Sequence, residues 1–159
     1  FTGGVSIGYD AMGGGSSAAI YGIAIGYEAH FDTEGSDYSI MIGYKAGYEG
    51  SSADNNIGIG KEALYGTNSL TTGASNVAVG YQAGWEIEQG AGNVYMGYKA
   101  GYENRHSDYA VFIGYEADED SVGTSDYAVA IGYKAKSSGS NVSVGREAGG
   151  ASVNCMHIG

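Results

Sequence analysis

Two acidic segments carry the side chains best suited to metal chemistry. HFDTEGSD (residues 30–37) and ADEDSVGTSD (residues 117–126) space carboxylates at short intervals beside glycine and serine. Oxygen ligands at such intervals can bind Ca²⁺, and the candidate ligands are Asp32, Glu34, Asp37, Asp118, Asp120 and Asp126. Neither segment fits the EF-hand loop or the G-G-x-G-x-D repeat of calcium-binding β-rolls. We therefore interpret both as solvated acidic loops and expect no metal site, with calcium as the weaker alternative.

The same carboxylates are poor candidates for catalysis. A glycosidase places two carboxyl groups across a cleft and needs one of them in an apolar setting, whereas these acids lie among Gly and Ser. His30, His106 and His157 fall at unrelated points and are interpreted as surface residues, and Cys155 lacks the partners of a nucleophile. No G-x-x-x-x-G-K-[ST] phosphate loop occurs. We expect no enzyme, no catalytic residue and no cofactor, with polysaccharide hydrolysis as a minor alternative.

Three aromatic residues are candidates for contact with a sugar or another surface. Tyr48, Trp85 and Tyr102 occupy one equivalent place in YKAGYE, YQAGWE and YKAGYE. Tyr and Trp offer large contact area at low entropic cost, so exposed aromatics at turns make good platforms. The alternative is that these rings pack against a neighbouring coil or chain, and the sequence favours neither interpretation.

Composition and charge exclude several partners. The 159 residues include 30 Gly and 15 Tyr but no Pro, and the formal net charge is −11. Binding to nucleic acid or to an anionic membrane surface requires a basic footprint, which this chain lacks. No run of 18 apolar residues is present, so we expect no membrane insertion.

One short phrase, roughly V-x-[IV]-G-Y-x-A, recurs about every 17 residues and positions all of these side chains. Its copies are marked by Gly8, Gly26, Gly43, Gly60, Gly80, Gly97, Gly114, Gly132 and Gly145. Alternating Val, Ile and Tyr are typical of strands, and the Gly, Ser, Asn, Asp and Thr between copies are typical of turns. We predict an all-β fold, a parallel β-solenoid in which one continuous array over residues 1–159 forms one coil per copy. Because the chain starts and stops within a copy, we expect a fragment of something longer.

Stacked coils would align equivalent residues in ladders. The position two after each glycine is mostly charged and alternates in sign, which would place Glu over Lys: Asp10, Glu28, Lys45, Glu62, Gln82, Lys99, Glu116, Lys134 and Glu147. The position one after the glycine is mostly Tyr. We interpret it as an aromatic ladder on the flank of the coil or between chains, and a sugar-stacking face is the alternative.

The strands carry apolar residues on both faces, as in YAVFIGY (residues 109–115). We expect Val, Ile, Met and Ala to point inward and form a thin core. A single slim solenoid cannot bury the second face as well, so we predict a parallel homotrimer, intertwined or side by side. Three chains would carry 3 × (−11) = −33, which favours solubility.

The phrases YAVAIGYKA, NVAVGYQAG and NVSVGREAG resemble head repeats of trimeric autotransporter adhesins of the YadA type. EALYGTNSLTTGASNVAVGYQAG (residues 62–84) is more similar still to repeats of phage tail-fibre proteins. The chain departs from the adhesin pattern by its longer spacers at 30–37 and 117–126 and by Tyr where a small residue is usual. The resemblance implies a left-handed β-roll in a trimeric fibre.

The resemblance therefore implies a structural, receptor-binding role on a virion, outside the cell or at the cell surface. We expect a phage tail fibre that contacts a host glycan or protein receptor. The alternatives are a bacterial surface adhesin, and an extracellular filament or a solenoid that binds ice or another solid.

Overall fold

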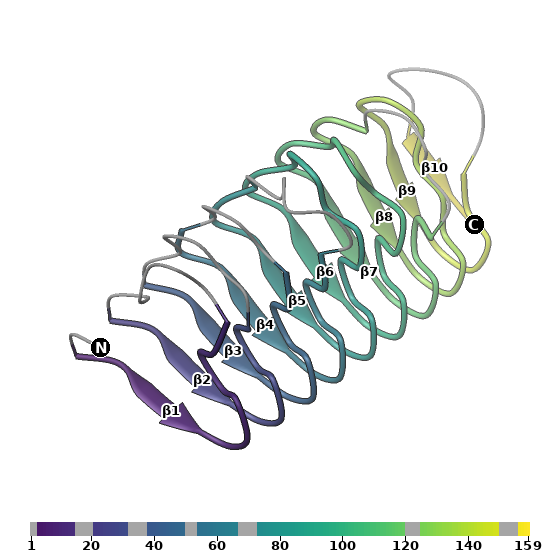
Figure 1. Ribbon diagram of the computed structural model, residues 1–159. Coiled ribbons are helices and arrows are strands. Elements are labelled where there is room, and N and C mark those ends of the chain that lie inside the picture. Colours follow the sequence, from purple (N-terminus) through teal and green to yellow (C-terminus); the bar gives the residue numbers. More distant parts are fainter. Residues whose placement is uncertain are drawn as a thin grey trace.

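The computed structural model describes residues 3–14, 21–31, 38–49, 54–66, 73–119, 125–149 and 156–159. These residues contain ten strands of three residues each: β1 (Val5–Ile7), β2 (Ile23–Ile25), β3 (Ile40–Ile42), β4 (Ile57–Ile59), β5 (Val77–Val79), β6 (Val94–Met96), β7 (Val111–Ile113), β8 (Val129–Ile131), β9 (Val142–Val144) and β10 (Met156–Ile158). They form one parallel sheet in chain order (Figure 1). The prediction of a parallel β-solenoid with coils of about 17 residues is confirmed.

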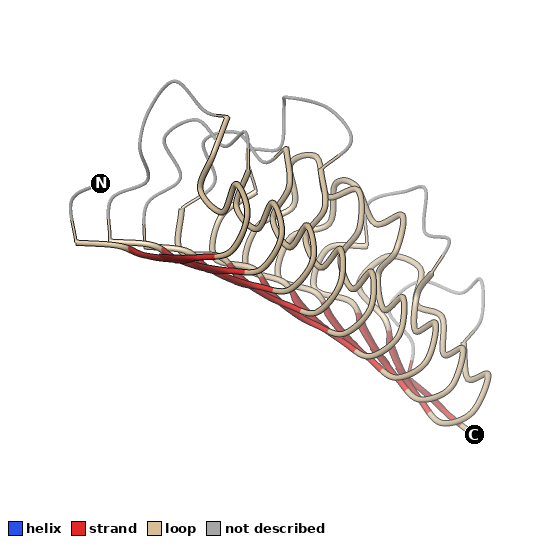
Figure 2. Ribbon diagram, turned by 60° about the horizontal axis from the view of Figure 1, so that its bottom comes forward, coloured by secondary structure: helices blue, strands red, loops and turns tan. Residues whose placement is uncertain are grey.

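The register of the sheet aligns equivalent positions of the repeat. Ile40 pairs with both Ile23 and Ile57, each 17 residues away. The hydrogen bonding continues beyond the strands, where Glu28 donates its N–H to the Tyr9 carbonyl at 2.9 Å. Figure 2 shows the strands along one side of the molecule and the turns and loops on the other. Each three-residue strand is therefore held by its place in a long stack, since so short a strand is unstable alone.

A glycine ends each of the first nine strands for a steric reason. These nine glycines have φ between 131° and 142°, a region that L-residues rarely adopt. A Cβ on Gly97 would also collide with the carbonyl oxygen of Gly114, its equivalent in the next coil. Two residues later the chain takes a left-handed conformation, as at Lys99 with φ 51°. These two conformations turn the chain sharply away from the strand.

The turn decides which side chains face the core, and one expectation from the sequence is wrong. Only the middle residue of each strand points inward, as do Tyr95 and Phe112, while the flanking Val and Ile point outward. The alanine three residues after each strand-end glycine is buried in every coil: Ala11, Ala29, Ala46, Ala63, Ala83, Ala100, Ala117, Ala135 and Ala148. Simple alternation would have placed this alanine on the side of the outward Val and Ile. The alternation fails because the glycine φ reverses the direction of the chain.

Buried asparagines close one corner of the coil. Asn56, Asn76 and Asn93 directly precede their strands. The side-chain oxygen of Asn56 accepts the N–H of Asn76 at 2.7 Å, and that of Asn76 accepts the N–H of Asn93 at 2.8 Å. Their amide groups donate to carbonyls on the far side of the corner, as from Asn76 to Gly90 at 2.8 Å. The polar groups of these three asparagines are thus paired within the stack, as their burial requires.

Candidate interaction surfaces

The outward residues of the strands form a continuous apolar surface, which we call the outer sheet face. It comprises the first and third residues of β1 to β10, all of them Val, Ile or Met. Ile7, Ile59, Met96 and Val144 are exposed in the single chain, and the corresponding residues of most other strands are half-buried. Parallel sheets normally have both faces covered, and a contiguous apolar patch of this kind marks an interaction surface.

Beside this face runs the strand-end tyrosine ladder: Tyr9, Tyr27, Tyr44, Tyr81, Tyr98, Tyr115 and Tyr133. Neighbouring rings stack with centroids 4.9–5.3 Å apart and planes within 13° of parallel. Lys61 replaces one tyrosine and sits between two rings, with its Nζ 5.5 Å from the Tyr44 centroid and 5.6 Å from that of Tyr81. The phenols are 36–67% exposed. The expected aromatic ladder is present on the flank of the coil.

The charged ladder lies next to the tyrosines, and two of the expected Glu–Lys pairs form between neighbouring coils. Lys45 pairs with Glu28 at 3.1 Å and Lys134 with Glu116 at 2.9 Å. The Lys134 ammonium holds the pKa of the Glu116 carboxyl below its usual range, and the hydrogen bond to this carboxylate raises the pKa of the Tyr115 phenol. Lys99 departs from the pattern because its ammonium pairs with Glu119, at 3.5 Å, and not with Glu116.

Tyr48, Trp85 and Tyr102 belong to a second stack, the mixed aromatic ladder, which consists of Phe31, Tyr48, Tyr65, Trp85 and Tyr102. The centroids are 4.7–5.8 Å apart. Both faces of Tyr48 and Trp85 are covered by other rings, and the Lys99 ammonium lies 4.3 Å from the Tyr102 centroid. These rings pack against neighbouring coils, and they present edges rather than open faces to the solvent.

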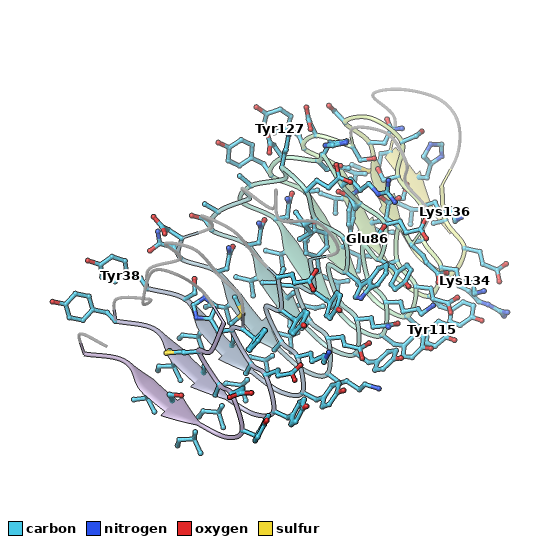
Figure 3. The ribbon with its side chains drawn as sticks, in the orientation of Figure 1. Tyr38, Glu86, Tyr115, Tyr127, Lys134 and Lys136 are labelled. Atoms are coloured by element: carbon cyan, nitrogen blue, oxygen red, sulfur yellow. The ribbon has the colours of Figure 1, made fainter. Side chains whose placement is uncertain are left out.

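The structure also reveals exposed tyrosines that the sequence interpretation missed. Tyr21 stacks on Tyr38, and Tyr109 stacks on Tyr127, each pair at 5.5 Å. All four have φ of 56–60° and are 54–64% exposed. Tyr38 and Tyr127 lie along the opposite edge from Tyr115 and Lys134 (Figure 3). The available signal was a Tyr two residues before the strand in YGIAI, YSIMI, YAVFI and YAVAI.

The candidate calcium ligands do not come together in the described part of the chain. Asp118 is fully buried and accepts the Ser137 N–H at 3.0 Å and the Asn104 amide at 3.4 Å. Asp126 accepts the Asp108 N–H at 3.0 Å. Among the described residues no three His, Cys, Asp or Glu side chains gather as a metal ion would need. Asp32, Glu34, Asp37 and Asp120 lie outside the described residues.

The histidines are not all on the surface, so that interpretation is wrong for one of them. His30 is 1% exposed, and its burial lowers the pKa of the imidazole to about 4. The turn places it inward because it lies one residue after the buried Ala29, in a left-handed conformation with φ 53°. His106 is exposed and lies 3.7 Å from Glu88. Cys155 lies outside the described residues.

Comparison with protein-family models, with curated proteins and with solved structures finds no significant match to this chain. No role is therefore carried over from a relative. Within the described ranges no helix has the length and apolar character needed to cross a membrane.

Proposed function

We propose that the chain is a non-enzymatic segment of a trimeric phage tail fibre that contacts a host surface. A bacterial surface adhesin is the alternative with the same architecture. The observation that carries the proposal is the outer sheet face, a double row of Val, Ile and Met along ten strands. The repeats of the chain also resemble those of such fibres, and this resemblance implies a left-handed coil.

A parallel homotrimer is a simple way to cover this face. Identical chains would bring identical apolar rows together along their whole length, and cyclic symmetry closes the assembly without a free face. The outward Val, Ile and Met cannot be buried inside the single chain instead. Its interior is already filled by the middle residues of the strands and by the alanines of the turns. The acidic surface of the trimer would oppose sideways aggregation.

The oligomeric state is the first test, by light scattering coupled to size exclusion. The wild-type chain is expected to have three times the mass of the monomer. A variant with Ile42→Lys, Val79→Lys and Ile113→Lys is expected to be monomeric with an unchanged circular dichroism spectrum. The matched control places three lysines on the opposite edge, Tyr21→Lys, Tyr38→Lys and Tyr127→Lys, and should remain trimeric. A monomeric wild-type chain would reject the trimer.

Receptor contact is assigned to the edge of the sheet opposite the strand-end tyrosine ladder. Tyr38 and Tyr127 offer exposed rings there, whereas the rings of the mixed aromatic ladder cover one another. Binding of the labelled trimer to an array of bacterial surface glycans tests this assignment. Tyr38→Ser with Tyr127→Ser should abolish binding, and Tyr27→Ser on the other edge should leave it unchanged. Binding that survives the double variant would contradict the assignment.

A further inference from the structure

The strand-end tyrosine ladder holds five pairs of neighbouring phenols in one repeated geometry. The centroids of Tyr9 and Tyr27 are 5.3 Å apart, as are those of Tyr27 and Tyr44. Tyr98 lies 5.2 Å from Tyr81 and 4.9 Å from Tyr115, and Tyr115 lies 5.2 Å from Tyr133. All these side chains are exposed, so their rings can rotate about Cα–Cβ and Cβ–Cγ bonds. The ortho carbons of adjacent rings can therefore meet.

Carboxylates stand beside two of these phenols. The Tyr115 hydroxyl hydrogen-bonds to Glu116, and the Tyr27 hydroxyl hydrogen-bonds to Glu28. Lys134 and Lys45 pair with the same two carboxylates at 2.9 and 3.1 Å, which favours their ionised form. An ionised carboxylate at a phenol can accept its proton as an electron leaves the ring. The ladder thus combines stacked reactants with a local base.

We propose that the strand-end tyrosine ladder is a site of oxidative dityrosine cross-linking between neighbouring coils, driven by hydrogen peroxide through a haem peroxidase. Each of two tyrosines loses one electron and one proton to give a phenoxyl radical. The radicals form a carbon–carbon bond between their ortho carbons, and the hydrogen on each ortho carbon then moves to the adjacent oxygen and restores both phenols. The two electrons and two protons reduce one H₂O₂ to two H₂O.

Such a bond would join successive coils covalently, a role that disulfide bridges fill in other proteins. The sequence contains one cysteine, so a single chain can form no internal disulfide bridge. Each dityrosine would close a loop of 17 or 18 residues between successive coils, for example from Tyr98 to Tyr115. Closing loops restricts the unfolded chain and so raises stability, as a disulfide does.

Lys61 supplies an internal negative control. It occupies the coil between Tyr44 and Tyr81, so these two tyrosines are two steps apart, roughly 10 Å at the spacing of parallel strands. Its ammonium also lies between the two rings. Direct coupling of Tyr44 to Tyr81 is therefore excluded by the geometry, while pairs on either side of the interruption should couple.

The test treats the full chain with a haem peroxidase and hydrogen peroxide and maps dityrosine by mass spectrometry of proteolytic fragments. Links within one chain are expected between neighbours of the ladder, with a higher thermal midpoint and no Tyr44–Tyr81 link. Mixed ¹⁴N- and ¹⁵N-labelled chains distinguish links within a chain from links between chains. Dityrosine that is absent while free tyrosine couples in the same reaction, or found only between chains, would overturn the proposal. The outcome is separate from the mass of the assembly, because the expected links need one chain only.

Two substitutions test the local base, and a third tests the ladder itself. Glu116→Gln should lower the yield of both links made by Tyr115 several-fold and leave the Tyr9–Tyr27 link unchanged. Glu147→Gln, at the same position of the repeat beside Arg146 instead of a tyrosine, should leave every link unchanged. Tyr98→Phe should remove the links to Tyr81 and Tyr115 while the fold persists by circular dichroism. Undiminished Tyr115 links in Glu116→Gln would reject the role of the carboxylate.

Discussion

The inward and outward positions of the three-residue strands differ in residue type and in burial. The inner row holds one residue per coil and ranges from Gly58 to Tyr95, and its members are buried from β2 to β9. The outer rows hold only Val, Ile and Met, of nearly constant size, and remain partly exposed in the single chain. The inner row is varied because each coil packs its own interior. The outer rows are uniform, as expected of a surface that meets another regular surface.

The strand-end glycine decides which side chains face inward and which face outward. Replacing it should therefore have the largest effect on stability. Gly97→Ala forces a Cβ into the Gly114 carbonyl at a φ of 133°. We expect a loss of about 4 kcal/mol or more in the free energy of unfolding, measured by urea denaturation. Gly92→Asn is the control, since Asn55 occupies the equivalent position with a left-handed φ of 61°. Its Cβ would meet the exposed ring of Tyr109, which can turn aside, and not a backbone atom. Similar losses in both variants would contradict the steric role of the strand-end glycines.

Adjacent residues of β7 compare the sides directly. Phe112→Ala should cost about 3–5 kcal/mol of stability, because Phe112 is fully buried and the truncation leaves a cavity. Val111→Ala, one residue earlier on the outer sheet face, should cost about 1 kcal/mol in folding and act mainly by weakening self-association. Thermal unfolding and light scattering at matched concentrations measure both effects. Equal folding losses would show that the strand is not two-sided.

Lowering the pH should destabilise the fold through the buried His30. Its pKa is about 4 in the folded chain against an ordinary value of 6.5, so the unfolded chain takes up the proton first. Stability contributed by the neutral imidazole is therefore present above pH 6.5 and is lost as pH falls towards 4. The loss should reach about 3 kcal/mol.

His30→Leu is the matched variant, because Leu64 occupies the same position of another coil. Its unfolding free energy should fall less than that of the wild type between pH 6.5 and 4. Parallel pH profiles of the two proteins would reject the effect of His30. The carboxylates that also titrate in acid are common to both proteins and cancel in the comparison.

The smallest effect is expected on the open flank of the coil. Lys134→Gln removes the ion pair with Glu116, a contact between partly exposed side chains. Such pairs contribute only a few tenths of a kcal/mol, and salt weakens them further. Urea denaturation at low and high ionic strength should show a small difference that disappears with salt. A loss above about 1 kcal/mol would place this pair among the structural contacts of the core.

The register of the fold was predictable from the sequence, but the facing of the side chains was not. The regular glycines align Ile23, Ile40 and Ile57, and the structure pairs them as expected. Alternation assigned Val and Ile to the core because it assumes an extended chain through the whole phrase. The unusual φ of the glycine breaks that assumption, and it also turns His30 inward.

The same limit applies to the aromatic residues. The equivalence of Tyr48, Trp85 and Tyr102 was visible in the sequence, and so was the chance that they pack against neighbouring coils. Their mutual stacking became clear only in three dimensions. Tyr38 and Tyr127 escaped notice because a tyrosine in a left-handed conformation is unusual, so the repeated Tyr before the strand was not interpreted as a turn position.

The length of the coil varies far more than its register. Successive strands start 20 residues apart from Ile57 to Val77 but only 13 apart from Val129 to Val142, and both pairs remain in step. The chain between one turn and the next strand can therefore change in length without a cost to the sheet. A foreign peptide inserted into this connection would therefore be displayed at a position along the solenoid that is set by the coil that carries it.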